Sequence, residues 1–241
     1  MKSKQSQILF YIFSLAAFIL FVGLGCWQLQ RLQEKEAMLA PMRDFDLRAV
    51  SIMTLPVDEN TGYQLYTYTS RKGLLDQTKP LFRPGAINPY PSANPAERLG
   101  YDLYLPLTGN GKAILVNFGW VEPAMRDRMI ANAAAKKVFP IEVTVNGWFM
   151  APQAQKTFTP PNNPLENQWF WHDFPAMEAY AGYQFLPFIL YNDLNWYGTA
   201  RAPLWQSIPN NHRQYAWTWF GLALVQLAAT IAYGLKARAQ S

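Results

Sequence analysis

Ile8 to Trp27 read ILFYIFSLAAFILFVGLGCW, a segment without a charged side chain. As an α-helix rising about 1.5 Å per residue, it spans roughly 30 Å, the thickness of the hydrocarbon core of a bilayer. Tyr215 to Leu235 read YAWTWFGLALVQLAATIAYGL, which is also uncharged and long enough to span. Aromatic residues cluster near the ends of both segments, as they do in the interfacial belts of membrane helices. We therefore expect transmembrane helices at 8–27 and 215–235.

A cleaved signal peptide is the alternative interpretation of the first segment. Its apolar run is longer than the roughly 7–15 residues of a signal-peptide core, and no Ala-x-Ala pattern follows Gly25. The chain continues from Gln28 as QLQRLQEKEAML, which contains strong helix formers and no turn residue. We therefore expect an uncleaved helix that continues to about Met42.

Two spans place both termini on one side of the membrane and the residues between the spans on the other. Basic residues at both chain ends favour a cytoplasmic N-terminus, 1–7, and a cytoplasmic C-terminus, 236–241, around an extracytoplasmic domain at 28–214. No Arg- and Ser-rich transit peptide precedes the first span. The sequence thus predicts a multi-pass protein of the bacterial cytoplasmic (inner) membrane, with its main domain on the periplasmic side.

The composition narrows the function classes. The chain has 241 residues, of which 50% are hydrophobic and only 15% charged, and its net charge is +5. The Lys and Arg residues are scattered, which argues against a nucleic-acid partner. One cysteine and two histidines exclude a disulfide framework and multi-thiolate or His-rich metal sites.

The middle of the chain alternates short β-branched and aromatic runs with turn residues, so the fold class is a membrane protein of the α+β type. We expect a small antiparallel sheet or a partly open barrel with short helices, carried between the two spans. The clearest hairpin pairs 102–108 with 112–121 around Asn110-Gly111, a dipeptide that favours tight turns. The other expected elements are strands at 62–69, 141–149 and 188–192, helices at 124–137 and 174–181, and Pro-rich loops at 84–95 and 159–164.

Catalytic motifs are missing from the sequence: it contains no G-x-S-x-G, H-E-x-x-H, Walker A or G-x-G-x-x-G pattern. We therefore do not expect an enzyme. Cys26 lies within the first span and is interpreted as a packing residue. His172 lies in the aromatic run Trp169-Phe-Trp-His-Asp-Phe174, which is more typical of a packed segment than of a ligand.

His212 is the stronger ligand candidate. Pro209 favours a helix start near Asn210, which places His212 in the first turn, with Tyr215 and Trp219 on its face. The helix N-terminus favours a neutral imidazole that is able to bind a metal.

The first span ends on the same side of the membrane, where Trp27 and Arg31 share a face. A haem with its iron on His212 and a propionate near Arg31 suits this arrangement. Ordinary interfacial anchoring is the simpler alternative.

Four blocks of sequence resemble the Surfeit locus protein one family, which comprises membrane factors for the assembly of haem–copper terminal oxidases. The blocks are Leu24-Gly-Cys-Trp-Gln-Leu-Gln-Arg-Leu-Gln-Glu-Lys35, Ile114-Leu-Val-Asn-Phe-Gly-Trp-Val121, Pro161-Asn-Asn-Pro-Leu-Glu-Asn-Gln-Trp-Phe-Trp-His-Asp173 and Pro209-Asn-Asn-His-Arg-Gln-Tyr-Ala-Trp-Thr-Trp-Phe220. They occur in the family's order and cover nearly the whole chain. The chain departs from the family pattern at Phe118, where the family usually has arginine.

The resemblance implies a role in cytochrome c oxidase biogenesis, with a-type haem as a transient cofactor. It implies that His212 is the haem ligand and therefore the metal-binding residue. Trp27, Gln28, Arg31, Tyr215 and Trp219 are the implied surrounding contacts. The implied partners are the catalytic subunit of the oxidase, the enzymes of haem a synthesis and the lipid bilayer. A structural accessory subunit that binds no haem is the alternative.

Overall fold

The computed structural model describes residues 2–43, 65–89, 98–109 and 111–239 of the chain. The chain divides into two compact units: residues 1–45 together with 204–241, and residues 46–203. The first unit is helical and the second is built around a β-sheet.

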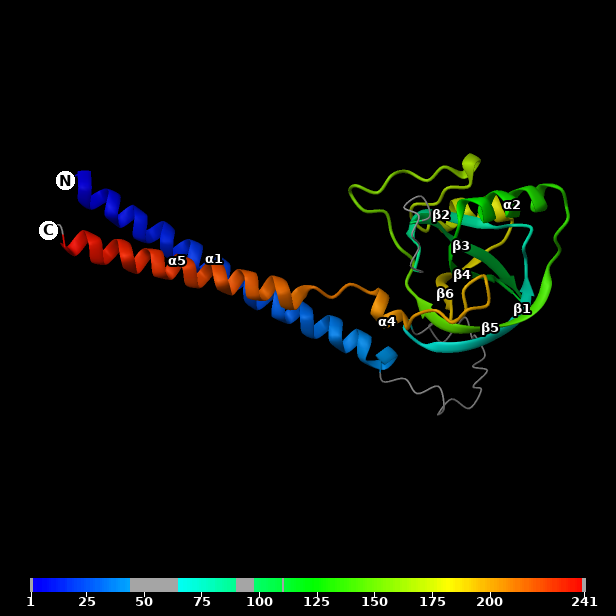
Figure 1. The fold of residues 1–241 in the computed structure, drawn as a ribbon, viewed down its shortest axis with the longest axis horizontal. Coiled ribbons are helices and arrows are strands. Elements are labelled where there is room, and N and C mark those ends of the chain that lie inside the picture. The colour runs from blue at the N-terminus through cyan, green and yellow to red at the C-terminus, as the bar shows by residue number, and fades with distance from the viewer. Residues whose placement is uncertain (1, 44–64, 90–97, 110, 240–241) are drawn as a thin grey trace. The chain divides into compact units, whose positions relative to one another are not determined.

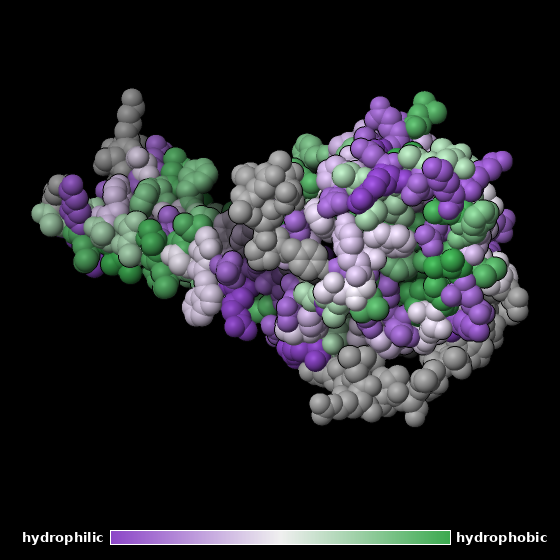
Figure 2. Space-filling view, turned by 45° about the vertical axis from the view of Figure 1, so that its right-hand side comes forward, coloured by the Kyte–Doolittle hydropathy of each residue, from purple (hydrophilic) through white to green (hydrophobic). Residues whose placement is uncertain are grey.

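Two long helices, α1 (Lys2–Arg43) and α5 (His212–Ala239), form the first unit and pack side by side in antiparallel orientation (Figure 1). Both are long and apolar enough to cross a membrane, by length and composition. They pack closely because small residues, such as Ala216 and Ala223, are buried between them. Hydrophobic residues cover much of the visible surface of this helix pair (Figure 2).

The helix boundaries refine the sequence analysis. Helix α1 continues through Gln28 to Arg43, so the expected extension of the first apolar segment is confirmed. The second helix starts two residues after Asn210: α5 begins at His212, so the expected position of His212 in the first turn is confirmed. The backbone carbonyl of Asn211 accepts the first helical hydrogen bond, from the Tyr215 N–H at 3.2 Å. Asn211 is therefore the N-cap, a position that asparagine favours, and Pro209 lies outside the helix. The short helix α4 (Leu204–Ser207) precedes it.

The second unit is a six-stranded sheet that closes on itself. The strands are β1 (Tyr68–Leu75), β2 (Leu81–Ile87), β3 (Leu99–Thr108), β4 (Ala113–Val121), β5 (Ile141–Met150) and β6 (Phe185–Asn192). They lie in the order β1-β5-β6-β4-β3-β2, and β1 also pairs with β3 through Leu74 and Leu75. The expected barrel is thus present, with β2 added outside the closed ring. The expectation of a purely antiparallel sheet was wrong, because β4 and β6 pair in parallel.

The hairpin of β3 and β4 is confirmed, with Leu107 opposite Ile114. Its turn residue Asn110 lies outside the described residues. The strand expected at 62–69 is displaced: residues 62–64 lie outside the described residues, and β1 begins only at Tyr68. Tyr66 has a φ of 62°, which lies outside the extended region, so strand β1 starts after this residue.

The expected Pro-rich loop at 84–95 was wrong for residues 84–87, which belong to strand β2. Proline lacks a backbone donor and is tolerated in sheets only at edges and bulges. Pro84 satisfies both conditions, since β2 is the last strand of the sheet order and its register with β3 shifts between Pro84 and Ala86. Residues 90–97 lie outside the described residues.

Strands β5 and β6 and the two expected short helices are confirmed. Helix α3 (Phe174–Ala181) begins after Asp173, whose carboxylate accepts a hydrogen bond from the Ala176 N–H. Helix α2 (Pro123–Ala134) ends three residues earlier than expected, because Lys136 has a φ of 52° and leaves the helical region. In the loop before α3, a single 3-10 turn, η3, covers Pro164–Glu166.

The sheet buries one apolar layer on each face. The inner layer fills the barrel with alternate residues of the strands, such as Leu103 and Leu105 of β3, and Met129 of α2 packs against it. The outer layer joins Leu81 and Leu115 to Met177 of α3 and to Trp169, which is 0% exposed. Alternate residues of a strand point to opposite faces, so β2, β3, β4 and β6 contribute to both layers, whereas β1 and β5 contribute only to the inner one.

Candidate functional site

The helix pair brings together two of the residues selected from the sequence, His212 and Gln28. The imidazole Nδ1 of His212, the first residue of α5, lies 2.8 Å from Oε1 of Gln28 on α1. Gln28 is 9% exposed, so this contact lies within the interface between the helices. One turn earlier, a Cβ on Gly25 would lie 2.6 Å from the ring of Phe220. The absence of a side chain at Gly25 therefore lets the helices approach closely beside the contact.

The hydrogen bond defines the chemistry available to His212. An amide oxygen only accepts hydrogen bonds, so Nδ1 carries the hydrogen and donates it to Gln28. In the neutral ring, Nε2 then holds the lone pair. Among the described residues no partner for Nε2 is found. A histidine that donates from one ring nitrogen and offers the other is the usual form of an iron ligand, so His212 fits a haem.

The other four residues selected from the sequence lie on the same two helices, within about two turns of Gln28 or His212. Trp27 and Tyr215 are 49% and 54% exposed. Trp219 stacks on Phe21 of α1, with ring centroids 6.0 Å apart. Arg31 forms an ion pair with Glu34 one turn along α1, at 2.7 Å. Its guanidinium is thus held by a carboxylate of its own helix.

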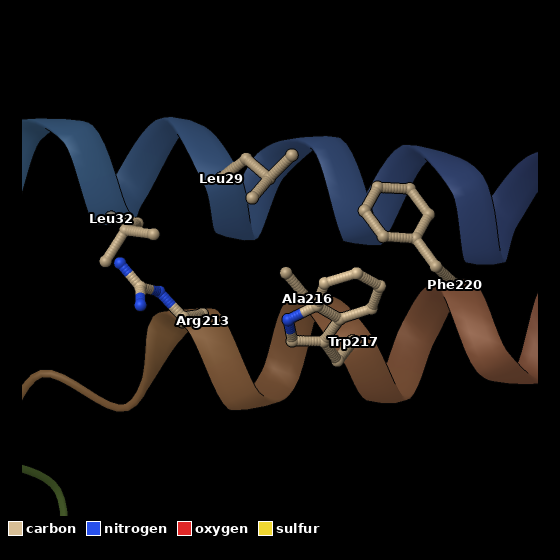
Figure 3. Close-up of a pocket in the computed structure, with 6 residues that line it drawn as sticks. All are labelled: Leu29, Leu32, Arg213, Ala216, Trp217 and Phe220. Atoms are coloured by element: carbon tan, nitrogen blue, oxygen red, sulfur yellow. The ribbon is translucent and has the colours of Figure 1, made fainter.

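A cavity of about 390 Å³ is lined by residues of both helices of the pair (Figure 3). Its lining residues are Leu29, Leu32, Arg213, Ala216, Trp217 and Phe220. Residues two apart in a helix point about 200° apart, so Leu29 faces away from Trp27, and Trp217 faces away from Tyr215.

Sequence reasoning missed this cavity. The spacing of Arg213, Trp217 and Phe220 at i, i+4 and i+7 was the available signal, because it places them on one helix face.

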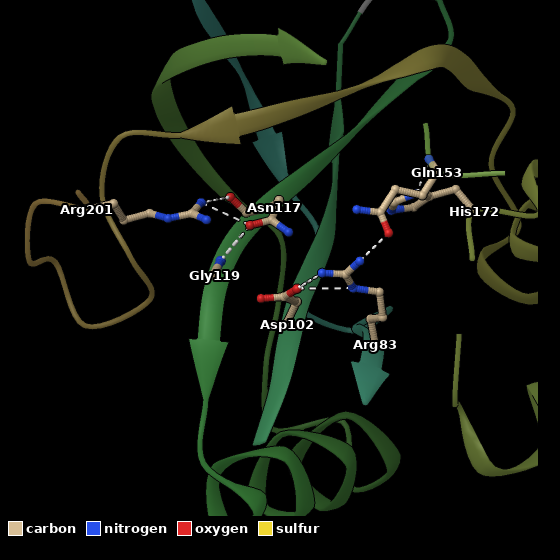
Figure 4. A network of polar contacts seen from close by, with 7 residues as sticks. All are labelled: Arg83, Asp102, Asn117, Gly119, Gln153, His172 and Arg201. Carbon is tan, nitrogen blue, oxygen red and sulfur yellow. Dashed lines mark hydrogen bonds and ion pairs between the residues drawn. The ribbon is translucent and has the colours of Figure 1, made fainter. Parts of the chain in front are cut away.

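A polar network on the outer face of the barrel is the second candidate site (Figure 4). Arg83 of β2 forms an ion pair with Asp102 of β3 and donates to the side chain of Gln153. The backbone N–H of Gln153 donates to the ring Nδ1 of His172 at 2.8 Å. In return, the backbone N–H of His172 donates to the backbone carbonyl of Gln153 at 2.9 Å. These bonds hold the segment that precedes α3 against the sheet.

His172 is a buried structural residue, as the sequence analysis expected. It is 6% exposed and contacts the ring of Tyr104 edge-on, with centroids 5.1 Å apart. Burial, with a smaller effect from the positive charge of Arg83, lowers the pKa of His172 to about 3. Burial also raises the pKa of Tyr104 well above its usual range. His172 is thus neutral at physiological pH, with its hydrogen on Nε2.

A second arginine fixes the strand bulge that contains the Asn117-Phe-Gly119 sequence. Asn117 Oδ1 accepts the backbone N–H of Gly119 at 2.8 Å and Nη1 of Arg201 at 2.9 Å. Gly119 has a φ of 77°, and a Cβ there would lie 3.1 Å from Nε of Arg201. Glycine is therefore required by both the backbone and the neighbouring guanidinium.

Both polar clusters of the barrel lack the features of a reactive centre. Within residues 2–43, 65–89, 98–109 and 111–239, no group of three or more His, Cys, Asp or Glu side chains is placed to hold a metal ion. Arg83 and Arg201 are engaged by acceptors of the protein itself. The helix pair is therefore the better candidate for a ligand site.

Comparison with known proteins identifies the family whose sequence pattern this chain matches. A sequence model described as the SURF1 family matches residues 15–224. This match spans most of α1, the whole barrel and about the first half of α5, and so includes both Gln28 and His212.

Individual relatives match over most of their length. A SURF1-like protein from Rickettsia bellii is 30% identical over 87% of this chain and 84% of its own. Surfeit locus protein 1 from Mus musculus is 28% identical over 83% of this chain and 67% of its own. The Homo sapiens protein of that name is 26% identical over 92% of this chain and 76% of its own.

Proposed function

This chain belongs to the SURF1 family, and on that premise we propose that it is a membrane-bound assembly factor for a haem–copper terminal oxidase, which holds a-type haem through His212. The contact between His212 and Gln28 is the observation that carries the proposal, since it gives Nδ1 of the imidazole the acceptor that a haem-ligating histidine needs. The protein is not an enzyme in this proposal. It binds the haem and passes it to the catalytic subunit.

The two long apolar helices support a location in the bacterial cytoplasmic membrane. With both termini in the cytoplasm, the barrel lies on the periplasmic side. The partners are then the catalytic subunit of the oxidase, the enzymes of haem a synthesis and the surrounding lipid. A cytoplasm-only reporter inserted in the β3–β4 turn is expected to be inactive, and an active reporter there would reverse this topology.

A bound haem would supply an iron that a histidine nitrogen can ligate, and the residues of the chain would hold and orient the haem. His212 Nε2 would provide that nitrogen. Trp27, Tyr215 and Trp219 would offer aromatic surface beside it. Arg31 would offer a cation to a propionate, in competition with Glu34.

Purification from cells that make haem a tests the proposal. We expect the wild-type protein to carry a haem spectrum and His212→Ala to lose it. His172→Asn is the matched control, because it removes the other of the two histidines of the chain and keeps an acceptor for the Gln153 N–H. A spectrum that survives His212→Ala would refute His212 as the ligand.

A structural accessory subunit is the second candidate function, and the cavity on the helix pair favours it. Trp217, which lines the cavity, is 73% exposed, and Leu224 and Val225 are 67% and 68% exposed on the same helix. These side chains are available to pack against helices of a partner. Haem-free protein that co-purifies in equal amount with the mature oxidase would establish this function instead.

A further inference from the structure

We infer that Gln28 is a positioning residue, which holds His212 in its Nδ1-protonated tautomer and so directs Nε2 to the haem iron. The inference rests on the proposed function for the identity of the ligand, but the tautomer itself is a property of the protein alone. In the absence of a partner, neutral histidine in water prefers hydrogen on Nε2. A haem ligand needs the opposite arrangement, and an acceptor at Nδ1 produces it.

The position of Gln28 makes it an effective acceptor. Its Oε1 lies 2.8 Å from Nδ1 of His212, although the two residues are 184 positions apart in the chain. Gln28 is 9% exposed, so water competes poorly for this hydrogen bond. The close approach of the helices at Gly25 and Phe220, one turn away, limits the movement of the two side chains.

Nearby polar residues do not provide the same constraint. Arg31 and Gln30 both bond to Glu34, and their side chains lie along the exposed part of α1. Removal of Gln28 therefore leaves His212 free to rotate or to change tautomer. A side chain that accepts a hydrogen bond from a metal-ligating histidine typically contributes about 10–100-fold to metal affinity.

The two histidines of the chain provide an internal comparison. His172 accepts at Nδ1 from the Gln153 N–H, so its hydrogen is on Nε2. His212 donates from Nδ1 to Gln28, so its hydrogen is on Nδ1. In the full-length protein, free of haem and without a histidine tag, ¹⁵N-histidine NMR in lipid nanodiscs at neutral pH should resolve two opposite tautomers.

The test compares three substitutions. Gln28→Leu removes the acceptor, and we expect the His212 signals to move to the Nε2–H pattern while the His172 signals stay unchanged and report an intact barrel. Gln28→Glu keeps an acceptor, and we expect it to retain the Nδ1–H tautomer. Gln30→Leu is the matched control on an exposed position of α1 and should leave both histidines unchanged.

Titration with haem a gives the second readout. We expect Gln28→Leu to weaken haem binding by about 10–100-fold and to lower the ferrous iron–histidine stretching frequency. Gln28→Glu should restore binding and raise that frequency above the wild-type value, because a carboxylate is the stronger acceptor. A merely structural role in helix packing would not move the frequency in opposite directions in the two variants.

The outcomes separate the two claims. Wild-type protein that binds haem, with a His212 tautomer and iron–histidine frequency unaffected by Gln28→Leu, overturns the inference and leaves the proposed function intact. Wild-type protein that binds no haem refutes the proposed function and with it the role toward iron. In that case an Nδ1–H tautomer lost in Gln28→Leu still confirms the hydrogen bond itself.

Discussion

His172→Asn should flatten the acid dependence of folding stability. The pKa of His172 is about 3 in the folded protein and about 6.5 in an unfolded chain. Between these values the unfolded chain binds a proton that the folded chain excludes. The folded state is therefore fully stabilised above pH 6.5 and loses that stabilisation as the pH falls toward 3.

The loss of folding stability at acidic pH can be calculated from the two pKa values of His172. Proton linkage gives about 2 kcal/mol at pH 5 and about 3 kcal/mol at pH 4, relative to neutral pH. His172 is 6% exposed, so solvent screening reduces this only slightly. Asparagine does not titrate, and its side-chain oxygen replaces Nδ1 as acceptor for the Gln153 N–H.

Urea unfolding of the full-length protein in detergent micelles, followed by tryptophan fluorescence at pH 7 and pH 5, measures the difference. We expect the wild type to lose about 2 kcal/mol more than His172→Asn between these two pH values. Carboxylates that titrate in this range, such as Asp193, whose pKa burial raises, act equally in both proteins. The same pH dependence in the two proteins would refute the burial of a neutral His172.

Two further predictions use pairs of glycines as matched controls. Gly119 and Gly198 both have a φ of 77°, so substitution of either glycine by alanine should lower the free energy of unfolding by about 1–2 kcal/mol. Gly119→Ala should lower the free energy of unfolding by a further ~1 kcal/mol, because its Cβ would displace Arg201 from its acceptors. Chemical denaturation measures both variants, and equal losses of stability in Gly119→Ala and Gly198→Ala would contradict this. On α1, Gly23→Ala meets no neighbour and should raise the thermal stability of the helix pair, by up to about 1 kcal/mol from helix propensity. Gly25→Ala should lower it, since its Cβ would collide with an aromatic ring of α5, and a gain at both positions would disprove the close approach.

Local patterns were sufficient for part of the fold. The hairpin of β3 and β4 was predictable because alternation and an Asn-Gly turn are local signals. Strand β2 was not, since Pro84 opposes strand formation unless it lies at a bulge on the sheet edge, and edges are defined only by the completed sheet. The start of β1 was missed for a similar reason: the left-handed backbone of Tyr66 has no sequence signal as clear as glycine.

The candidate site shows the same division. His212 could be selected from the sequence because histidine is rare in this chain and this one lies beside an apolar segment. Its contact with Gln28 joins positions 184 residues apart, and no local pattern defines the register of one helix against another. The cavity beside Leu29 and Trp217 depends on that register in the same way.

The amino-acid sequence was sufficient to predict the two long apolar helices, the β-rich domain between them and the blocks of residues that mark the family. These features follow from hydrophobic period, segment length and residue type, all of which act over a few neighbouring residues. Only the tertiary structure showed the closure of the barrel through β1 and β3, the hydrogen bond from the Gln153 N–H to Nδ1 of His172 and the pairing of His212 with Gln28. Each of these depends on contacts between distant segments, whose geometry is fixed only when the whole core packs.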